Sequence, residues 1–305
     1  MKTHVTCIIL NYNHWEMTQE CITSLESSDY ENLTILIIDN NSLKKIDQLT
    51  YKNNHYDLFD NNYNNEQFEH HPIKVNSLYT IKNSINGGFS NGVNIGIKFA
   101  QTYLNTDYFW FLNNDTITNN STLSELLEST NQSTITGSTI FDMNSKPLRS
   151  KGSLTCLALS KPYSKKYTTH YIPFTSALIS KTIIENVGLL NEDLFLYYED
   201  ADYCKKCIDH GYVLKVSKKS IIKHNESASQ KLEINKSACP DWLPIYSKKH
   251  FMKTNQYPAI YIITSLLLSA LKRLKNGEFK KYKDIIMLLI NEKKLLKSHH
   301  YYQNK

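Results

Sequence analysis

The sequence lacks several features that would point to particular classes of protein. Residues 1–4 lead straight into the first predicted strand, so we expect no signal peptide, and the six cysteines are scattered. We therefore expect reduced thiols in a cytosolic protein. The net charge of +6 is too small to favour nucleic acid, and no nucleic-acid-binding motif is found. This charge is compatible with a phosphate-bearing ligand or an anionic membrane surface.

Glycine is also scarce, and the nine glycines are unevenly distributed: four lie within residues 86–96. A loop this rich in glycine lets the backbone come close to a ligand, and it leads into a helix whose N-terminus is a natural anion site. It is not a Walker loop, because no Lys-Ser/Thr follows, and its spacing does not fit the dinucleotide fingerprint. A tight turn with close helix packing explains these glycines equally well.

The 305 residues suffice for one large α/β domain and a small appendage. Apolar strands over Val5–Leu10 and Leu33–Ile38 flank a helix that starts at Trp15. This is a βαβ unit, which implies a parallel sheet. The two strands end in polar residues, at Asn11-Tyr12-Asn13 and at Asp39-Asn40-Asn41-Ser42, and we expect both tips at the same edge of the sheet.

A third strand, Tyr108–Leu112, is apolar throughout and ends in Asn113-Asn114-Asp115. Such a run is typical of a strand buried on both faces of a parallel sheet. Because ligands collect beyond the carboxyl ends of these strands, Asp115 is placed where a cation with oxygen ligands could meet a phosphate. Taken alone, the triplet is equally a turn that ends a strand.

A second acidic segment follows at residues 191–202, where Glu199, Asp200 and Asp202 lie within four positions. If a helix starts near Glu199, its dipole favours one or two of these acids. Crowding beside apolar residues could also raise one pKa toward the range of a general base. Cys204 and Cys207 follow on the same helix, and we interpret them as packing residues.

The remaining segments carry weaker signals. Residues 43–77 are interpreted as the remnant of a helix and a surface excursion with His70 and His71 in solvated loops, and the basic residues of 142–170 as a solvated loop. A further central strand is predicted over Ile172–Ile179. Helices near Ile260–Leu271 and Ile285–Ile290 are too short to span a bilayer; they could lie on an anionic membrane face, or pack on the catalytic domain or a second subunit.

Together these pieces resemble family 2 glycosyltransferases with the GT-A fold, particularly rhamnosyltransferase-like members that build bacterial surface polysaccharides. The resemblance covers most of residues 3–225 and consists of five motifs in order. They are Ile9–Asn13, Ile38–Ser42, Asn86–Gly96, Phe111–Asp115 and Tyr197–Asp202. The implied fold is a mixed, mostly parallel sheet flanked by helices, forming a catalytic domain over residues 1–240 with a C-terminal helical segment at 241–305.

The resemblance also implies roles for individual residues. Asp39 would accept a hydrogen bond from the pyrimidine of a UDP- or dTDP-sugar. Asp115 and His224 would bind a divalent cation, Mg²⁺ or Mn²⁺, although Asn113 stands where many relatives carry Asp. Asp200 would be the general base, with Glu199 beside it. Other residues would line the nucleotide pocket: Asn11, Tyr12, Asn13, Asn41, Asn86, Gly87, Asn91, Asn94, Asn113 and Asn114.

The reaction so implied is an inverting transfer of a sugar to a hydroxyl of a glycan or lipid-linked oligosaccharide, of the capsule or O-antigen type, at the inner face of the cell membrane. Two alternatives belong to other classes. One is a non-catalytic scaffold subunit that binds nucleotide sugar or glycan. The other, a nucleotidylyltransferase, would need a glycine- and lysine-rich loop after Leu10, which the sequence lacks.

Overall fold

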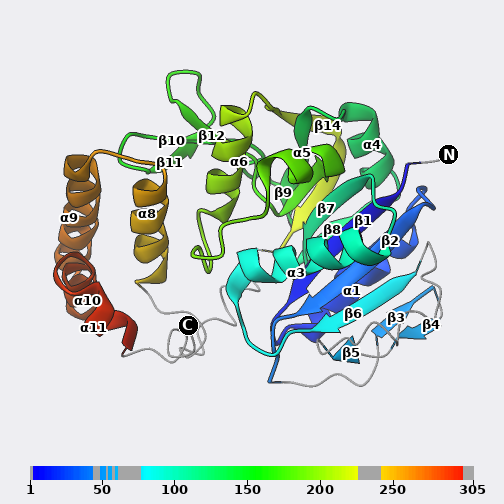
Figure 1. Ribbon diagram of the computed structural model, residues 1–305, viewed down its shortest axis with the longest axis horizontal. Helices are drawn as coiled ribbons and strands as arrows, with labels where there is room; N and C mark the ends of the chain where they lie inside the picture. Colours follow the sequence, from blue (N-terminus) through cyan, green and yellow to red (C-terminus); the bar gives the residue numbers. More distant parts are fainter. Residues whose placement is uncertain are drawn as a thin grey trace.

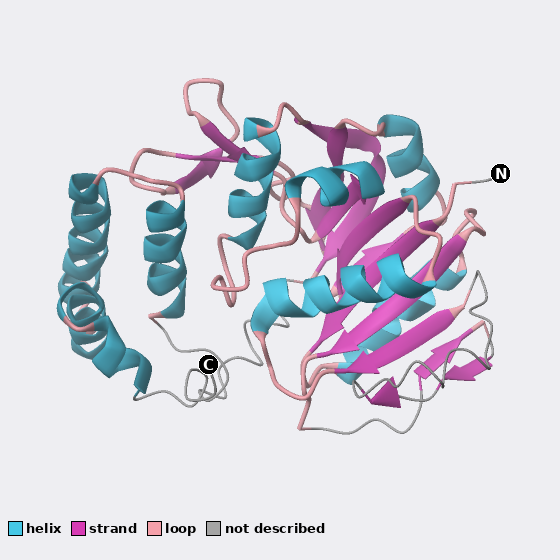
Figure 2. Cartoon of the chain, in the orientation of Figure 1, coloured by secondary structure: helices cyan, strands magenta, loops and turns pink. Residues whose placement is uncertain are grey.

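A nine-stranded sheet forms the centre of the protein in the computed structural model, which describes residues 3–43, 49–52, 54–56, 59–60, 77–225 and 242–297 (Figures 1 and 2). The strand order is β5-β6-β2-β1-β7-β13-β9-β14-β8. Its members are β1 (Val5–Asn11), β2 (Leu33–Asp39), β5 (Phe59–Asp60), β6 (Leu78–Lys82), β7 (Tyr108–Asn113), β8 (Thr116–Thr118), β9 (Thr134–Asp142), β13 (Ser176–Ser180) and β14 (Val213–His224).

Most strands of this sheet run in one direction. The pairs β5–β6, β6–β2, β2–β1, β1–β7 and β9–β14 are parallel, whereas β13 is antiparallel to both β7 and β9, and β8 is antiparallel to β14. The carboxyl ends of β2, β1, β7 and β14 therefore share one edge. The predicted mixed, mostly parallel sheet is confirmed.

The far end of the sheet curls back toward its middle. Only Asn114 and Asp115 separate β7 from β8 along the chain, yet β13, β9 and β14 stand between these two strands in the sheet. The sheet must curve for a two-residue link to join them. This curvature brings the end of β14 beside Asp115.

Both faces of the sheet are buried by helices, as the all-apolar strands predict. Alternate residues of one strand enter different hydrophobic clusters: Ile8 packs on one face, and Cys7 and Ile9 on the other. Helices α1 (Trp15–Glu26) and α4 (Thr122–Ser129) cover the face of Ile9. The opposite face is covered by α3 (Gly88–Tyr103), α5 (Lys181–Val187) and α6 (Glu199–Asp209).

The segment 142–170 is not the solvated loop that its charges predicted. It contains a three-stranded antiparallel sheet of β11 (Ser160–Pro162), β10 (Gly152–Leu154) and β12 (Thr169–Tyr171). Lys151 donates from Nζ to the carbonyl of Leu214 at 2.8 Å, and burial lowers the pKa of this ammonium. Strands of three residues carry too little periodicity to be recognised in a sequence.

One other prediction changes. The strand predicted over Ile172–Ile179 begins only at Ser176, because a turn occupies Phe174 and Thr175. The described part of residues 43–77 contains β5 and a separate pair of short strands, β3 (Leu49–Tyr51) and β4 (Asn54–Tyr56). Most of this segment, where the helix remnant was predicted, lies outside the described residues. His70 and His71 lie outside the described residues.

Helices form the C-terminal part, at the left of Figure 1. They are α8 (Leu243–Thr254), α9 (Ala259–Lys275), α10 (Phe279–Ile290) and α11 (Glu292–Lys297), of which α9 and α10 correspond to the two predicted helices. They share a hydrophobic cluster that includes Trp242, Leu266 and Leu288 and that also takes in Phe195 from the segment before α6. None of the described helices is long and apolar enough to pass through a membrane.

Candidate active site

The tips of β1 and β2 are joined by a network of hydrogen bonds around Asp39. Asn11 and Asp39 are register partners, and the Asn11 Nδ2 donates to Asp39 Oδ1 at 3.2 Å and to Ser42 Oγ at 3.0 Å. The backbone N–H of Ser42 lies 3.3 Å from both carboxylate oxygens of Asp39. Burial raises the pKa of the Asp39 carboxyl, and the hydrogen bonds from Ser42 and Asn11 oppose that rise. Asp39 is thus held rigidly at the sheet edge.

Two asparagines shape the loops that leave these strands. Asn13 and Asn41 have φ of 63° and 62°, a left-handed conformation that asparagine tolerates better than most residues. Asn13 Oδ1 accepts a hydrogen bond from the Leu43 N–H at 2.7 Å, which ties the two loops together. Tyr12, between Asn11 and Asn13, is half-buried.

The tip of β7 is attached to the same network through α1. Asn114 Nδ2 donates to Thr18 Oγ1 at 3.0 Å, and this hydroxyl donates to Asn11 Oδ1 at 2.9 Å. Asn113, which precedes it, is the register neighbour of Leu10 on β1. Three predicted strand tips therefore meet at one place.

The glycine-rich loop packs directly against the acidic segment. Asn86 Oδ1 accepts from the Gly88 N–H at 3.1 Å, and the Phe89 N–H donates to the Phe195 carbonyl at 2.7 Å. A Cβ at Gly88 would lie 2.2 Å from that carbonyl oxygen, and one at Gly87 would lie 2.1 Å from Asn91 Oδ1. Close packing accordingly demands glycine at both positions.

Glu192 connects these two segments, a role that the sequence did not reveal. Its Oε2 accepts from Asn91 Nδ2 and its Oε1 from Asn94 Nδ2, each at 2.9 Å. Asn94 is buried, and its two amide atoms also bond to the backbone of Leu190 at 3.0 Å. Asn94 thus faces Glu192 and Leu190, so its contribution to a ligand site would come from fixing this loop.

Asn83 extends the chain of contacts back to Asp39. Its N–H donates to the Asp39 carbonyl at 2.8 Å, and its Nδ2 donates to Asn91 Oδ1 at 3.0 Å. Asn83 comes directly after β6, and Asn11 is the last residue of β1. A polar residue at the end of a strand was therefore the signal by which the sequence could have indicated Asn83. The network runs without a break from Asp39 through Asn83 and Asn91 to Glu192.

Glu199 and Asp200 begin α6, as the sequence predicted. Two consecutive tyrosines with positive φ, Tyr197 at 72° and Tyr198 at 68°, lead into this helix. Bulky residues rarely adopt this conformation, and such strain is concentrated at functional sites. The Tyr198 hydroxyl donates to the Ala158 carbonyl at 2.8 Å, which holds the turn in place.

The two carboxyls share an environment that disfavours charge. Burial raises the pKa of both Glu199 and Asp200, and repulsion from Asp200 raises that of Glu199 further. The backbone N–H of Ala201 donates to Asp200 at 2.7 Å, whereas Glu199 Oε2 is buried without a hydrogen-bond partner among the described residues. The pair therefore holds a proton at a higher pH than free carboxyls do.

Asp115 and His224 form the third cluster. His224 Nε2 lies 3.0 Å from Asp115 Oδ1, and both side chains are largely buried. The described residues contain no group of three or more His, Cys, Asp or Glu arranged to hold a metal; this contact joins one carboxylate and one imidazole. Cys204 and Cys207, by contrast, are buried in the core, which agrees with their interpretation as packing residues. The described cysteines form no disulfide.

Residues 6–188 match the profile of a known family, Glycosyl transferase family 2. The chain belongs to this family. The match includes the Asp39 network and Asp115, and it ends before the Glu199–Asp200 pair and His224.

The chain is similar to a curated protein of Haloferax volcanii, the low-salt glycan biosynthesis hexosyltransferase Agl10, with 31% identity over 140 residues. This alignment covers 42% of the chain and 45% of Agl10, so the chain spans less than half the length of that relative.

Solved structures resemble the fold. GalNAc-T7 with UDP, GalNAc and Mn²⁺ matches with a TM-score of 0.56 at 14% identity, over 82% of the chain and 48% of GalNAc-T7. The mannosyltransferase PcManGT of Pyrobaculum calidifontis, with GDP-Man and Mn²⁺, matches with a TM-score of 0.50 at 14% identity, over 99% and 85% of the two chains. S. aureus TarS 1-349 with UDP gives a TM-score of 0.50 at 13% identity, over 97% and 83%. The predicted GT-A architecture is confirmed.

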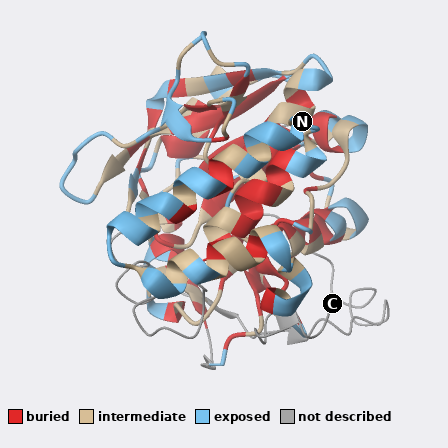
Figure 3. Cartoon of the chain, turned by 90° about the vertical axis from the view of Figure 1, so that its left-hand side faces the viewer, coloured by how far each residue is buried: buried red, intermediate tan, exposed pale blue. Residues whose placement is uncertain are grey.

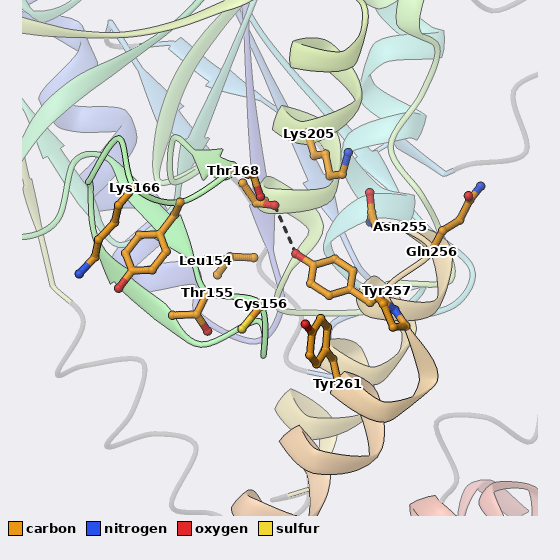
Figure 4. Close-up of a pocket in the computed structure, with 13 residues that line it drawn as sticks. Leu154, Thr155, Cys156, Lys166, Thr168, Lys205, Asn255, Gln256, Tyr257 and Tyr261 are labelled. Carbon is orange, nitrogen blue, oxygen red and sulfur yellow. Dashed lines mark hydrogen bonds between the residues drawn. The ribbon is translucent and has the colours of Figure 1, made fainter.

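A cavity of about 530 Å³ lies apart from the strand tips of this family-2 chain (Figure 4). Its walls come from the 154–156 and 166–169 segments, from Lys205 on α6, and from residues 255–261 at the junction of α8 and α9. The Tyr257 and Thr169 hydroxyls are hydrogen-bonded at 3.2 Å across it. Lys205, residues 255–258 and Tyr261 lie outside the family match, so part of the wall of this cavity comes from beyond the matched residues.

Proposed function

We propose that this protein is an inverting, metal-dependent glycosyltransferase. It transfers a hexosyl or deoxyhexosyl group, such as rhamnosyl, from a UDP- or dTDP-sugar to a hydroxyl of a growing bacterial surface glycan of the capsule or O-antigen type. The observation that carries the proposal is the continuous hydrogen-bond network that joins Asp39 at the sheet edge to Glu192 in the segment bearing Glu199 and Asp200. It connects a nucleotide site with a candidate base.

The nucleotide would bind over the tips of β1 and β2. Asp39 is buried and fixed by Ser42 and Asn11, so its carboxylate could accept a hydrogen bond from the N–H of a uracil or thymine ring at no cost in ordering. Tyr12, Asn41, Asn86 and Gly87 lie in the loops that leave this edge. Donors in similar structures agree with a nucleotide sugar: TarS carries UDP, and PcManGT carries GDP-Man.

Asp115 and His224 fit a divalent cation. Two ligands that occupy adjacent corners of an octahedron with bonds of about 2.1 Å lie about 3 Å apart, and the observed separation of Nε2 and Oδ1 is 3.0 Å. Mg²⁺ commonly takes one or two protein carboxylates and completes its shell with water and substrate phosphates. A bound cation would supply Lewis-acid stabilisation of the leaving diphosphate. The solved structures of GalNAc-T7 and PcManGT both contain Mn²⁺.

Asp200 would act as the base, with Glu199 as its neighbour. The Asp200 carboxylate would take the proton of the acceptor hydroxyl while that oxygen attacks the anomeric carbon from the face opposite the diphosphate. The raised pKa of the carboxyl makes it a stronger base than an ordinary aspartate, which suits proton transfer near neutral pH. Glu199 would orient the acceptor through its unpartnered oxygen.

A second candidate is a non-catalytic subunit that binds a nucleotide sugar. Asn113, which stands where many relatives carry Asp, favours it, because the substitution removes one anionic ligand for a metal. An assay of donor hydrolysis separates the two functions. UDP- and dTDP-sugars are incubated with the protein and Mn²⁺, with and without EDTA, and the released nucleotide is measured. EDTA-sensitive release supports the transferase, and binding without turnover of any donor supports the scaffold.

A further inference from the structure

We propose that the helical hairpin of α9 and α10 is a docking surface for an anionic membrane. Figure 3 looks onto this end of the molecule, where exposed stretches run along the helices nearest the viewer. On α9 the exposed stretch includes an apolar stripe of five side chains that are between 39% and 64% exposed: Ile260, Ile263, Leu267, Leu271 and Leu274.

The spacing of these residues places them on one line along the helix. At 3.6 residues per turn they occupy about 80° of the circumference and extend for about 21 Å. The other side of α9 is already used, because Ser265, Leu266 and Ala270 are buried against the rest of the protein. The stripe is therefore an outward face that the described chain leaves uncovered, and exposed apolar surface of this extent marks an interaction site.

The positive charge of the C-terminal segment favours an anionic membrane as the partner of this surface. Residues 242–305 contain thirteen Lys and Arg against three Asp and Glu, so the basic character of the whole chain is concentrated here. Lys272 and Lys275 end α9, and Lys280 and Lys283 lie in the first turns of α10; all four are exposed and form no ion pair within the described chain. Phe279 is 63% exposed between them. An apolar stripe flanked by basic residues is the pattern of helices that lie in the interface of an anionic bilayer.

The tyrosine-lined cavity borders this surface. Tyr261 belongs both to the exposed part of α9 and to the cavity wall, together with Tyr257 and Tyr167 (Figure 4). Lys166, from the same wall, is exposed. Tyrosines are enriched at the level of lipid headgroups, since one end of the ring is apolar and the other is wet. The cavity would open at that level when α9 lies on the membrane.

A second copy of the chain is the competing occupant. An isologous contact along α9 would bring two strongly basic segments together, and like charges across an interface cost free energy. An anionic lipid surface instead neutralises them. The proposal does not depend on the catalytic assignment, because it concerns lipid binding alone.

Sedimentation with vesicles tests the proposal on the full chain. We expect binding to vesicles of equimolar phosphatidylglycerol and phosphatidylcholine, and little binding to phosphatidylcholine alone. Leu267→Glu combined with Leu271→Glu should reduce binding at least about tenfold, because two leucines no longer enter the apolar layer. Each of Lys272→Gln and Lys280→Gln should reduce it roughly fivefold.

Matched controls come from exposed residues far along the chain. Val213→Glu, at an exposed apolar position of β14, and Lys218→Gln, at an exposed lysine, should leave vesicle binding unchanged. Equal losses in the controls, equal binding to both lipids, or no binding would overturn the proposal. The proposal would also be overturned if light scattering showed a dimer of the wild-type chain, and if the double leucine variant were monomeric but bound vesicles as well as wild type.

Discussion

His224 and Asp115 lie in contact, 3.0 Å apart, although more than a hundred residues separate them in the sequence. The contact arises because His224 is the last residue of β14 and its register partner on β8 is Thr116, the neighbour of Asp115. Neither residue alone would bind a divalent cation at this edge. Together they would supply two of the six ligands of an octahedral shell.

Removing the charge of Asp115 should weaken the binding of nucleotide only when metal is present. In Asp115→Asn we expect the affinity for UDP in Mn²⁺ to fall at least about tenfold, because hydrogen bonds and contacts to a charged group contribute roughly 1.5–3 kcal/mol. Calorimetric titration of UDP into the protein, with and without Mn²⁺, measures the two affinities. Asp29→Asn, at an exposed position, is the control, and unchanged metal-dependent affinity in Asp115→Asn would remove Asp115 from the cation site.

Asp200→Asn should abolish most transfer while nucleotide still binds. Loss of a general base costs about 10²–10⁴-fold in rate, and the strand-tip network that would hold the nucleotide does not include Asp200. Nucleotide release, measured with a transferable donor and acceptor, gives the rate, and calorimetry gives the affinity. Asp209→Asn, at the exposed end of the same helix, should behave as wild type. Full transfer by Asp200→Asn would contradict the assignment.

The same carboxyl pair should make the protein less stable as pH rises. Folded Glu199 and Asp200 have raised pKa values, so between about pH 4 and those values the folded state binds more protons than the unfolded state. Stability therefore falls with increasing pH in that window. Asp200→Asn should be more stable than wild type at pH 8, by on the order of 1 kcal/mol, and the gain should vanish at pH 4. Urea unfolding at the two pH values measures it; a gain of equal size at both would show that charge is not the cause.

Glu192→Ala should destabilise the protein more than Glu192→Gln does. Alanine leaves the amide donors of Asn91 and Asn94 without their acceptor, at a cost of about 1–3 kcal/mol for a buried group, whereas glutamine keeps one accepting oxygen. Thermal unfolding gives this order. Glu185→Ala, at an exposed site on α5, should be neutral, and equal stability of all three variants would mean that the bridge contributes nothing.

Two glycines with similar positive φ help to separate a steric effect from backbone strain. Gly88 and Gly188 have φ of 83° and 87°, but a Cβ would contact the Phe195 carbonyl only at Gly88. Gly188 combines this φ with a ψ of −167°, a region that is nearly exclusive to glycine, so Gly188→Ala should cost about 1–3 kcal/mol. Gly88→Ala should cost clearly more, and it should weaken donor binding because the loop has to move. Urea midpoints of the two variants decide the matter; an equal loss would show that the close approach is relieved without cost.

Local sequence patterns were sufficient to predict the strands that are buried on both faces of the sheet. The strands ending at Asn11, Asp39 and Asn113 are mainly apolar, and their polar ends marked the sheet edge correctly. The acidic run also indicated where α6 begins. These signals depend only on neighbouring residues, which a sequence displays directly.

Contacts between distant segments could not be predicted in this way. Glu192 stands among several acids, and nothing local distinguishes the one that meets Asn91 and Asn94. Antiparallel β13 and the three short strands of residues 152–171 depend on pairing with distant partners. Lys151 was misassigned to solvent for the same reason, since its acceptor, the carbonyl of Leu214, is brought to it only by the fold.

The pairing of β9 with β14 has a consequence for any shortened form of this protein. The family match ends at residue 188, but β14 begins only at Val213 and covers one side of β9. A fragment cut at residue 188 would expose the backbone of a nine-residue strand, Thr134–Asp142, along its whole length. Bare strand edges invite pairing with other chains. Such a minimal domain would aggregate, so the unit to express and purify has to include β14.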